Sequence, residues 1–471
     1  MVFSSPLFIF LYLPLTLVGY YVVPALTAGR RRRITYAWRG VWLFAVNLVF
    51  YAWGEPLYVF LMLASITFNY VLGLSIEKSS GKRGKKLLLI VCIAANMGAL
   101  GYFKYAGLFL TTLGFPAMQL TLPIGISFYT FQAMSYPIDV YRGKVPAQRN
   151  YVKFGTFVSL FPQLIAGPIV RYTEVAKQLD SRGHSVSKFS DGAVRFTLGL
   201  SKKVLLANNV GAMWSWYSTQ PADNISALGA WLGIAAFTLQ IYFDFSGYSD
   251  MAIGLGKMIG FEFPENFNYP YIADSVTEFW RRWHITLSKW FRDYVYIPLG
   301  GNRKGGARLA LNLLIVWCLT GFWHGASWNF LLWGLYYAIL LFAEKTFLLN
   351  ALGKLPKFVG HIYTLALVML GWTLFAIEDF AALGGYLPAM FGAGAAIDGA
   401  ALYWLRNYAV TFIIAAAACT PLPSLIAVKL GGKVPPLLKI CAKPAAILSA
   451  LCLCTASLIN SAYNPFLYFR F

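Results

Sequence analysis

Long apolar runs, separated by short polar and basic segments, occupy most of this chain of 471 residues. Several runs reach the roughly 20 residues that a helix needs to cross about 30 Å of hydrocarbon. Others are shorter or are interrupted by Pro and Gly. The pattern therefore predicts an all-α polytopic membrane protein. The runs lie at residues 7–26, 36–53, 57–76, 87–110, 120–141, 154–170, 191–211, 225–245, 309–326, 328–349, 359–378, 404–420 and 440–460.

Two segments have the composition of broken or re-entrant helices. Residues 161–170 and 254–270 combine apolar side chains with several Pro and Gly. Irregular backbone survives at membrane depth only where protein or a water-filled cavity surrounds it. We therefore expect both segments to be enclosed by the rest of the chain.

Composition supports one integral membrane domain over residues 1–471. The chain is 58% hydrophobic and 12% charged, whereas soluble proteins carry roughly 25% charged residues. Its formal charge of +21 comes from 39 Lys and Arg against 18 Asp and Glu. The basic residues cluster beside apolar runs, as at 78–86, so the positive-inside bias and anionic headgroups account for them without nucleic acid. They can also attract an acidic carrier protein or a phosphorylated donor.

His324 is the only ionisable residue in the Trp- and Phe-rich stretch 319–335. Ionisable groups in such a setting are costly and usually mark functional sites. Gly321 and Gly325 flank the histidine, and we expect them to leave room for another group to approach the imidazole. A neutral imidazole can take a proton from a hydroxyl, so His324 is a candidate general base.

His284 lies in a second Trp-rich stretch, 276–296, whose helical spacing predicts one amphipathic helix near the cytoplasmic surface. The ring is either a packed histidine bonded to a backbone carbonyl or a second member of a catalytic site. One face of the predicted helix carries Trp280, Trp283, His284, Leu287 and Phe291, and the other side carries Arg281, Arg282, Lys289 and Arg292.

Other kinds of site have little support. Two histidines without neighbouring Cys or carboxylates make a weak zinc site, so no metal is expected. Asp244 and Asp250 lie in an apolar run and suit either an ion or proton pathway or pairing with an Arg or Lys of a neighbouring helix. We favour pairing.

Four motifs together resemble the membrane-bound O-acyltransferase (MBOAT) family, in the bacterial branch of alginate O-acetylation, peptidoglycan O-acetylation and D-alanylation of teichoic acids. The resemblance covers most of the chain and is densest from about residue 123 to 335. The motifs are DFSGYSDMAIGLGKMIGF (244–261), FWRRWHITLSKWFRDYVYIPLGGNR (279–303), TGFWHGASWNFLLWG (320–334) and NPFLYFRF (464–471).

This resemblance implies an MBOAT-type ring of roughly 11–13 transmembrane and re-entrant helices around a central funnel. His324 matches the family's invariant histidine and His284 its second histidine or polar equivalent. The implied substrate-binding residues are Trp280, Trp283 and Trp323 and the cations Arg281, Arg282 and Lys289, with Arg292 also at the donor entrance.

The implied reaction moves an acyl group, in this branch acetyl, from a cytoplasmic thioester across the bacterial inner membrane to a polysaccharide such as alginate or peptidoglycan. Acetyl-coenzyme A or an acyl-carrier thioester would be the donor substrate, with no tightly bound cofactor. The implied partner is an extracytoplasmic SGNH-hydrolase-like acyltransferase, alongside a possible acyl carrier protein and membrane lipids. The alternatives are a transporter or flippase of an acylated or lipid-linked intermediate, which also has broken helices, and a noncatalytic scaffold.

The aromatic tail at 464–471 has two interpretations. Aromatic side chains at a membrane surface commonly act as an interfacial anchor. The tail also resembles a small membrane peptide that accompanies the D-alanylation relatives, which implies that it folds into the funnel. Tyr468 would then carry the acyl group as an ester after His324 removes its proton, and pass it to a serine of the outer partner.

Overall fold

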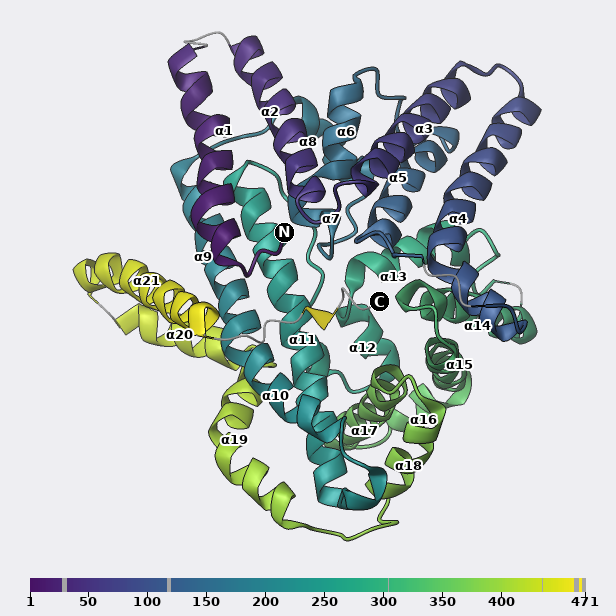
Figure 1. Ribbon diagram of the computed structural model, residues 1–471, viewed down its shortest axis with the longest axis vertical. Coiled ribbons are helices and arrows are strands. Elements are labelled where there is room, and N and C mark those ends of the chain that lie inside the picture. Colours follow the sequence, from purple (N-terminus) through teal and green to yellow (C-terminus); the bar gives the residue numbers. More distant parts are fainter. Residues whose placement is uncertain (28–31, 117–119, 304, 434, 461–465, 468–471) are drawn as a thin grey trace. The chain divides into compact units, whose positions relative to one another are not determined.

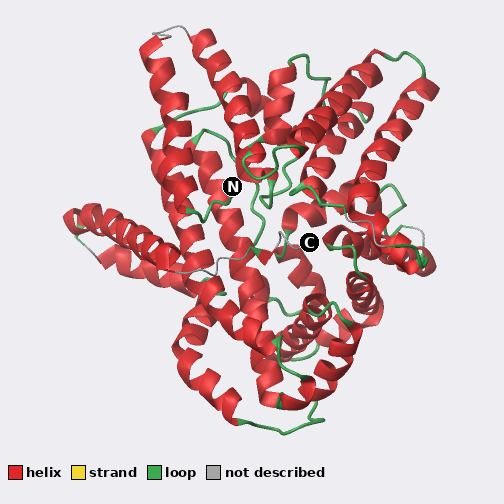
Figure 2. Cartoon of the chain, viewed as in Figure 1, coloured by secondary structure: helices red, strands yellow, loops and turns green. Residues whose placement is uncertain are grey.

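The computed structural model of this protein describes residues 1–27, 32–116, 120–303, 305–433, 435–460 and 466–467. This part of the chain consists of helices and loops and has no strand (Figure 2). Nine of the described helices are long and apolar enough to cross a membrane, so the predicted all-α polytopic fold is confirmed. Their spans are Phe8–Leu26, Tyr58–Lys78, Lys82–Thr112, Ala227–Met258, Gly306–His324, Trp328–Leu352, Lys357–Ala376, Gly399–Ala418 and Cys441–Asn460.

The helices group into two compact units. The first unit comprises Met1–Gly199 and Tyr248–Pro264, and the second comprises Leu200–Gly247 and Glu265–Phe471. Helices of the first unit are η1 (Phe8–Tyr12), α1 (Leu13–Thr27), α2 (Arg32–Ala52), α3 (Tyr58–Lys78), α4 (Lys82–Thr112), α5 (Ile126–Tyr141), α6 (Tyr151–Ser159), α7 (Phe161–Leu164), α8 (Tyr172–Asp180) and most of α9 (Val186–Ser201).

Helices α3, α4 and α5 of the first unit pack against one another (Figure 1). Lipid tails are as apolar as the helix surfaces, so close packing and hydrogen bonds between helices hold such groups together. Asn69 of α3 and Asn96 of α4 are both buried, and their side-chain amides exchange hydrogen bonds of 3.0 and 3.1 Å. This reciprocal pair fixes how α3 and α4 are aligned along their lengths, which the apolar pattern alone does not specify.

The two segments expected to be broken are irregular in the structure. Helix α7 is one turn long, and every residue from 161 to 170 is buried. The backbone N–H of Phe161 donates to the Asn47 side chain at 3.1 Å, which satisfies a group that a broken helix leaves free. Helix α11 ends at Met258, and the chain beyond it is not helical again until Pro270. Both segments are therefore irregular, as predicted. The expected enclosure holds for 161–170 but not for the whole of 254–270, because Glu262, Glu265 and Asn268 are exposed.

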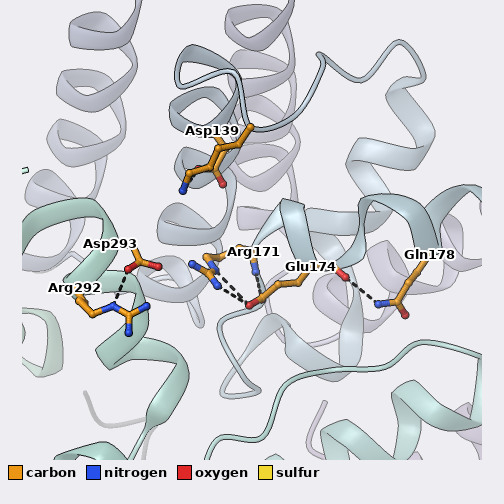
Figure 3. Close-up of polar contacts among 7 residues, drawn as sticks. Asp139, Arg171, Glu174, Gln178, Arg292 and Asp293 are labelled. Atoms are coloured by element: carbon orange, nitrogen blue, oxygen red, sulfur yellow. Dashed lines mark hydrogen bonds and ion pairs between the residues drawn. The ribbon is translucent and has the colours of Figure 1, made fainter. Parts of the chain in front are cut away.

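A short helix follows the first broken segment. Figure 3 shows its start, where the carboxylate of Glu174 accepts hydrogen bonds from the backbone N–H and the guanidinium of Arg171, both at 2.9 Å. The Gln178 side chain donates to the Glu174 carbonyl one turn later, also at 2.9 Å. These contacts fix where α8 begins.

The second unit holds the helices that position the candidate site, with α14 and α15 as an antiparallel pair and α17 beside α15 (Figure 1). A Cβ on Gly334 would collide with the carbonyl oxygen of Trp317, so this glycine permits the close approach of α14 and α15. The helices are η2 (Lys202–Ala207), α10 (Asn208–Tyr217), η3 (Ala222–Asn224), most of α11 (Ala227–Met258), η4 (Pro270–Ile272), α12 (Val276–Arg282), α13 (Ile285–Phe291), η5 (Arg292–Tyr296), α14 (Gly306–His324), α15 (Trp328–Ala343), η6 (Glu344–Leu348), α16 (Leu349–Leu352), α17 (Lys357–Ala376), α18 (Phe380–Met390), α19 (Gly399–Ala418), α20 (Leu422–Lys433) and α21 (Pro436–Asn460).

Candidate active site

A cavity of about 260 Å³ in the second unit is lined by both His284 and His324. Residues of α12, α13, η5, α14, α15 and η6 form its wall. The two histidines are 40 positions apart in the sequence. The structure brings them into one pocket.

His324 is the last residue of α14 and is 4% exposed. Its imidazole meets the rings of Trp333 and Phe375 edge to face, at centroid distances of 5.1 and 5.3 Å. A Cβ on Gly325 would collide with the Phe330 ring, and one on Gly321 with the Phe330 carbonyl oxygen. The glycines therefore admit α15 rather than a substrate, which corrects the sequence interpretation. His324 also lines the cavity.

His284 lies at a break between two short helices. Residues 276–296 do not form the single helix that the periodicity predicts, because α12 ends before His284 and α13 begins after it. His284 itself has left-handed backbone angles, φ 42° and ψ 53°. The N–H of Ile285 donates to the carbonyl oxygen of Asn266 at 3.0 Å, so a distant loop supplies a bond that the helix would otherwise make. The prediction of one continuous helix is wrong for this reason.

The same loop orients the His284 ring. Oδ1 of Asn266 lies 3.1 Å from Nδ1 of His284 and also accepts from the N–H and hydroxyl of Thr286, at 3.2 and 2.8 Å. An oxygen with two such donors is an acceptor, so Nδ1 of His284 carries the hydrogen and Nε2 carries the lone pair. Burial lowers the pKa of His284 to about 3, and the ring is therefore neutral at physiological pH.

Three tryptophans predicted to bind substrate occupy different places. Trp280 lines the cavity. Trp323 lies beside both histidines, with ring centroids 5.8 Å from His284 and 5.0 Å from His324. Trp283 does not line the cavity and packs in the aromatic core, 4.9 Å from the ring of Trp372.

Basic side chains line part of the pocket. Arg281 and Arg292, both proposed from the sequence, are lining residues, and so is Lys345 of η6. All three side chains are exposed. Nε of Arg292 donates to Asp293 at 2.8 Å, which partly neutralises its charge (Figure 3).

Two other predicted cations are not lining residues. Arg282 donates to the Glu278 carboxylate at 2.6 Å and to the carbonyl oxygen of Asn268 at 3.1 Å, so it holds α12 to the preceding loop. Lys289 lies on α13 outside the cavity wall. Lys345 was missed because Glu344-Lys345 follows the apolar run of α15, where charges are the ordinary mark of a membrane boundary.

The intramembrane carboxylates are paired, as expected from the sequence. In the second unit Nζ of Lys203 lies 2.5 Å from Oδ1 of Asp244, and both side chains are buried. In the first unit Arg195 bonds to Asp250 at 2.8 Å. Tyr468, the proposed acyl carrier, lies outside the described residues. Within those residues no three His, Cys, Asp or Glu side chains group in a way that could hold a metal ion.

Comparisons with known proteins agree with this architecture. The model of the membrane-bound O-acyltransferase family matches residues 146–352, which include both histidines. A probable alginate O-acetylase of Azotobacter vinelandii is 43% identical over 84% of this chain and 79% of its own length. A peptidoglycan O-acetyltransferase of Helicobacter pylori is 34% identical over 88% of this chain and 83% of its own. A teichoic acid D-alanyltransferase of Bacillus subtilis is 28% identical over 48% of this chain and 60% of its own.

The matches to the alginate O-acetylase and the peptidoglycan O-acetyltransferase extend over most of the chain, well beyond the motifs around the two histidines. The resemblance inferred from four short motifs is thereby confirmed. This chain belongs to the membrane-bound O-acyltransferase family and is a multi-pass membrane enzyme that transfers acyl groups to hydroxyls.

Proposed function

We propose that this enzyme transfers an acetyl group from a cytoplasmic thioester to a cell-envelope polysaccharide such as alginate or peptidoglycan, with His324 as general base. The observation that carries the proposal is the single cavity lined by His284, His324 and basic side chains. The names of two relatives, an alginate O-acetylase and a peptidoglycan O-acetyltransferase, support acetyl as the group transferred. We place the enzyme in the bacterial inner membrane.

His324 would accept the proton of a hydroxyl while the hydroxyl oxygen attacks the thioester carbonyl. The thiolate then leaves as the carbonyl reforms, and the imidazolium returns the proton to it. General-base help of this kind typically contributes about 10²–10⁴-fold. His324 ends α14, and a cation in the last turn of a helix is typically stabilised by about 0.3–1 kcal/mol. The aromatic walls limit water and so limit loss of the thioester by hydrolysis.

His284 would bind a substrate and would not accept the proton that is removed in the reaction. Its tautomer leaves Nε2 as a hydrogen-bond acceptor, so the ring suits an N–H or O–H of a substrate. It cannot donate to the oxyanion that forms at the thioester carbonyl. We therefore assign His284 to orienting a substrate beside His324.

The basic side chains would bind the negative part of the donor. Arg281, Arg292 and Lys345 suit the phosphates of acetyl-coenzyme A or the acidic surface of a carrier protein. Coulomb attraction from these exposed groups is screened over about 8–10 Å in physiological salt. Binding of the donor should therefore weaken as salt rises.

Tyr468 would carry the acetyl group between the two faces of the membrane. His324 removes the phenol proton, the phenolate oxygen forms an ester with the acetyl group, and the thiol leaves. An extracytoplasmic SGNH-hydrolase-like partner would then attack the ester through a serine and release the tyrosine. The burial of Phe466 and Leu467 within the second unit supports a docked tail rather than a surface anchor.

The test is transfer of label in proteoliposomes given a radiolabelled acetyl thioester inside. We expect the unchanged protein to become labelled on its tail, and His324→Gln and Tyr468→Phe to lose label while inserting normally. Labelling at the unchanged level in His324→Gln would contradict the general-base assignment. Donor-dependent export of an intact acylated compound without covalent labelling would instead indicate a transporter.

A further inference from the structure

A buried ion pair contacts the end of the chain. Lys203 of η2 and Asp244 of α11 are 2% and 1% exposed. Oδ1 of Asp244 lies 2.5 Å from the Lys203 ammonium, and Oδ2 accepts the backbone N–H of Leu467 at 2.8 Å. The ammonium also lies 5.8 Å from the ring centroid of Phe466. We refer to Lys203 and Asp244 as the docking pair.

The two tail residues are themselves buried, with Phe466 5% and Leu467 7% exposed. The docking pair therefore contacts the tail in two ways, through a backbone hydrogen bond to a carboxylate and through a cation above an aromatic face. Hydrogen bonds to ionised groups are roughly twice as strong as neutral ones. Both contacts fall on consecutive residues, so together they specify one position of the chain.

The energetics indicate a positioning role. Removing two charges from water is costly, and a buried ion pair often contributes little net stability compared with apolar residues of similar size. The best-attested use of such a pair is to select one register among several. The sequence from Phe466 to Phe471 contains several aromatic residues of similar size. Shifting its register against an apolar surface would therefore change the buried apolar area little. A directional bond to one backbone N–H removes that freedom.

We propose that Lys203 and Asp244 form an internal docking site that fixes the register of the C-terminal tail. Asp244 selects Leu467 through its N–H, and Lys203 selects an aromatic ring at the preceding position. The register matters because Tyr468 follows Leu467 directly, and consecutive Cα atoms are about 3.8 Å apart. This inference rests on the proposed function, in which Tyr468 has to reach the thioester. The docking pair would thus be a positioning device and take no part in the chemistry.

The experiment follows removal of the tail by a carboxypeptidase, with intact-mass spectrometry of the full-length protein in detergent. The double variant Lys203→Met/Asp244→Leu removes both charges at once, so no unpaired buried charge remains to unfold the protein. We expect Leu467 and Phe466 to be released about ten- to hundredfold faster than from the unchanged protein, the ratio that one hydrogen bond to a charged group represents. Labelling of Tyr468 by the acetyl donor should be lower in this double variant than in the unchanged protein.

The matched control is Arg195→Met/Asp250→Leu, which removes a second ion pair of α11, one whose two residues belong to the first unit. Its tail should be released at the unchanged rate. Unchanged release in the docking-pair variant would overturn the proposal whatever the activity. Faster release with full glycan acetylation would support the docking site, and together with an active Tyr468→Phe variant it would show that the relay is wrong.

Discussion

We expect Glu344→Gln to loosen the start of α12 and to lower both stability and transfer rate. Glu344 is 1% exposed, and its two carboxylate oxygens each accept one backbone N–H, from Val276 and from Thr277, at 2.7 Å. The hydroxyl oxygen of Ser275 accepts the next N–H, that of Glu278, at 3.1 Å. The first four N–H groups of a helix have no partner within it, so these contacts satisfy most of that end.

The size of the stability loss depends on how many of these hydrogen bonds the Gln side chain can still accept. Gln has nearly the same size, but only one of its two polar atoms can accept, so one N–H of α12 would face another donor. A hydrogen bond to a charged group contributes about 1.5–3 kcal/mol, and a buried donor without a partner costs about 1–3 kcal/mol. Because these overlap, we expect the free energy of unfolding to fall by roughly 2–4 kcal/mol. Helix α12 carries Trp280 and Arg281 of the cavity wall, so the transfer rate should fall as well.

Thermal unfolding of the purified protein in detergent and transfer from a labelled acetyl thioester measure the two effects. Ser275→Ala is the matched control, because it removes a neutral cap from the same helix end and should cost about 1 kcal/mol. The reasoning is refuted if Glu344→Gln unfolds and transfers like the unchanged protein. A larger loss in Ser275→Ala than in Glu344→Gln would refute the ranking of the two caps.

Three further outcomes are expected. Lys345→Ala should raise the KM for an anionic donor several-fold at low ionic strength and less at high salt, while Lys289→Ala, outside the cavity wall, should not; equal effects would contradict a local role. For His284 the folded pKa of about 3 lies below the unfolded value of about 6.5, so stability falls as pH drops from 6.5 toward 3, by up to about 2–3 kcal/mol at pH 4.5. Unfolding temperatures at pH 7.5 and 4.5 should therefore differ less in His284→Asn, and an unaltered difference would rule this out. Gly321→Ala should lower the free energy of unfolding by about 1–3 kcal/mol through overpacking, whereas Gly98→Ala, with open space around it, should not; similar melting of the two variants would disprove the packing argument.

The sequence pattern was sufficient for the features that depend on local composition. Apolar length predicts the spans, and the cost of a lone charge in lipid predicts that Asp244 and Asp250 are paired. Both predictions are confirmed. The family resemblance singled out His284 and His324 separately, and nothing in either motif indicates that the two line one pocket.

The missed features depend on contacts between distant segments. Residues 276–296 keep their apolar periodicity and contain no Gly or Pro. The pattern therefore does not reveal that the carbonyl oxygen of Asn266 accepts the N–H of Ile285 where the helix breaks. Glu344 and Lys345 look like an ordinary membrane boundary, yet one caps α12 and the other lines the cavity. Such roles become visible only when the partner segment is in place.

The left-handed backbone of His284 restricts what can replace it. Asn is several-fold enriched among residues with positive φ, whereas Ala and β-branched residues meet a steric penalty of about 1–2 kcal/mol there. Substitution by Ala would therefore have two effects at this position: it would remove the imidazole, and it would strain the left-handed backbone. His284→Asn keeps the turn and a polar side chain, so comparing it with His284→Ala separates the geometry of the chain from the chemistry of the ring.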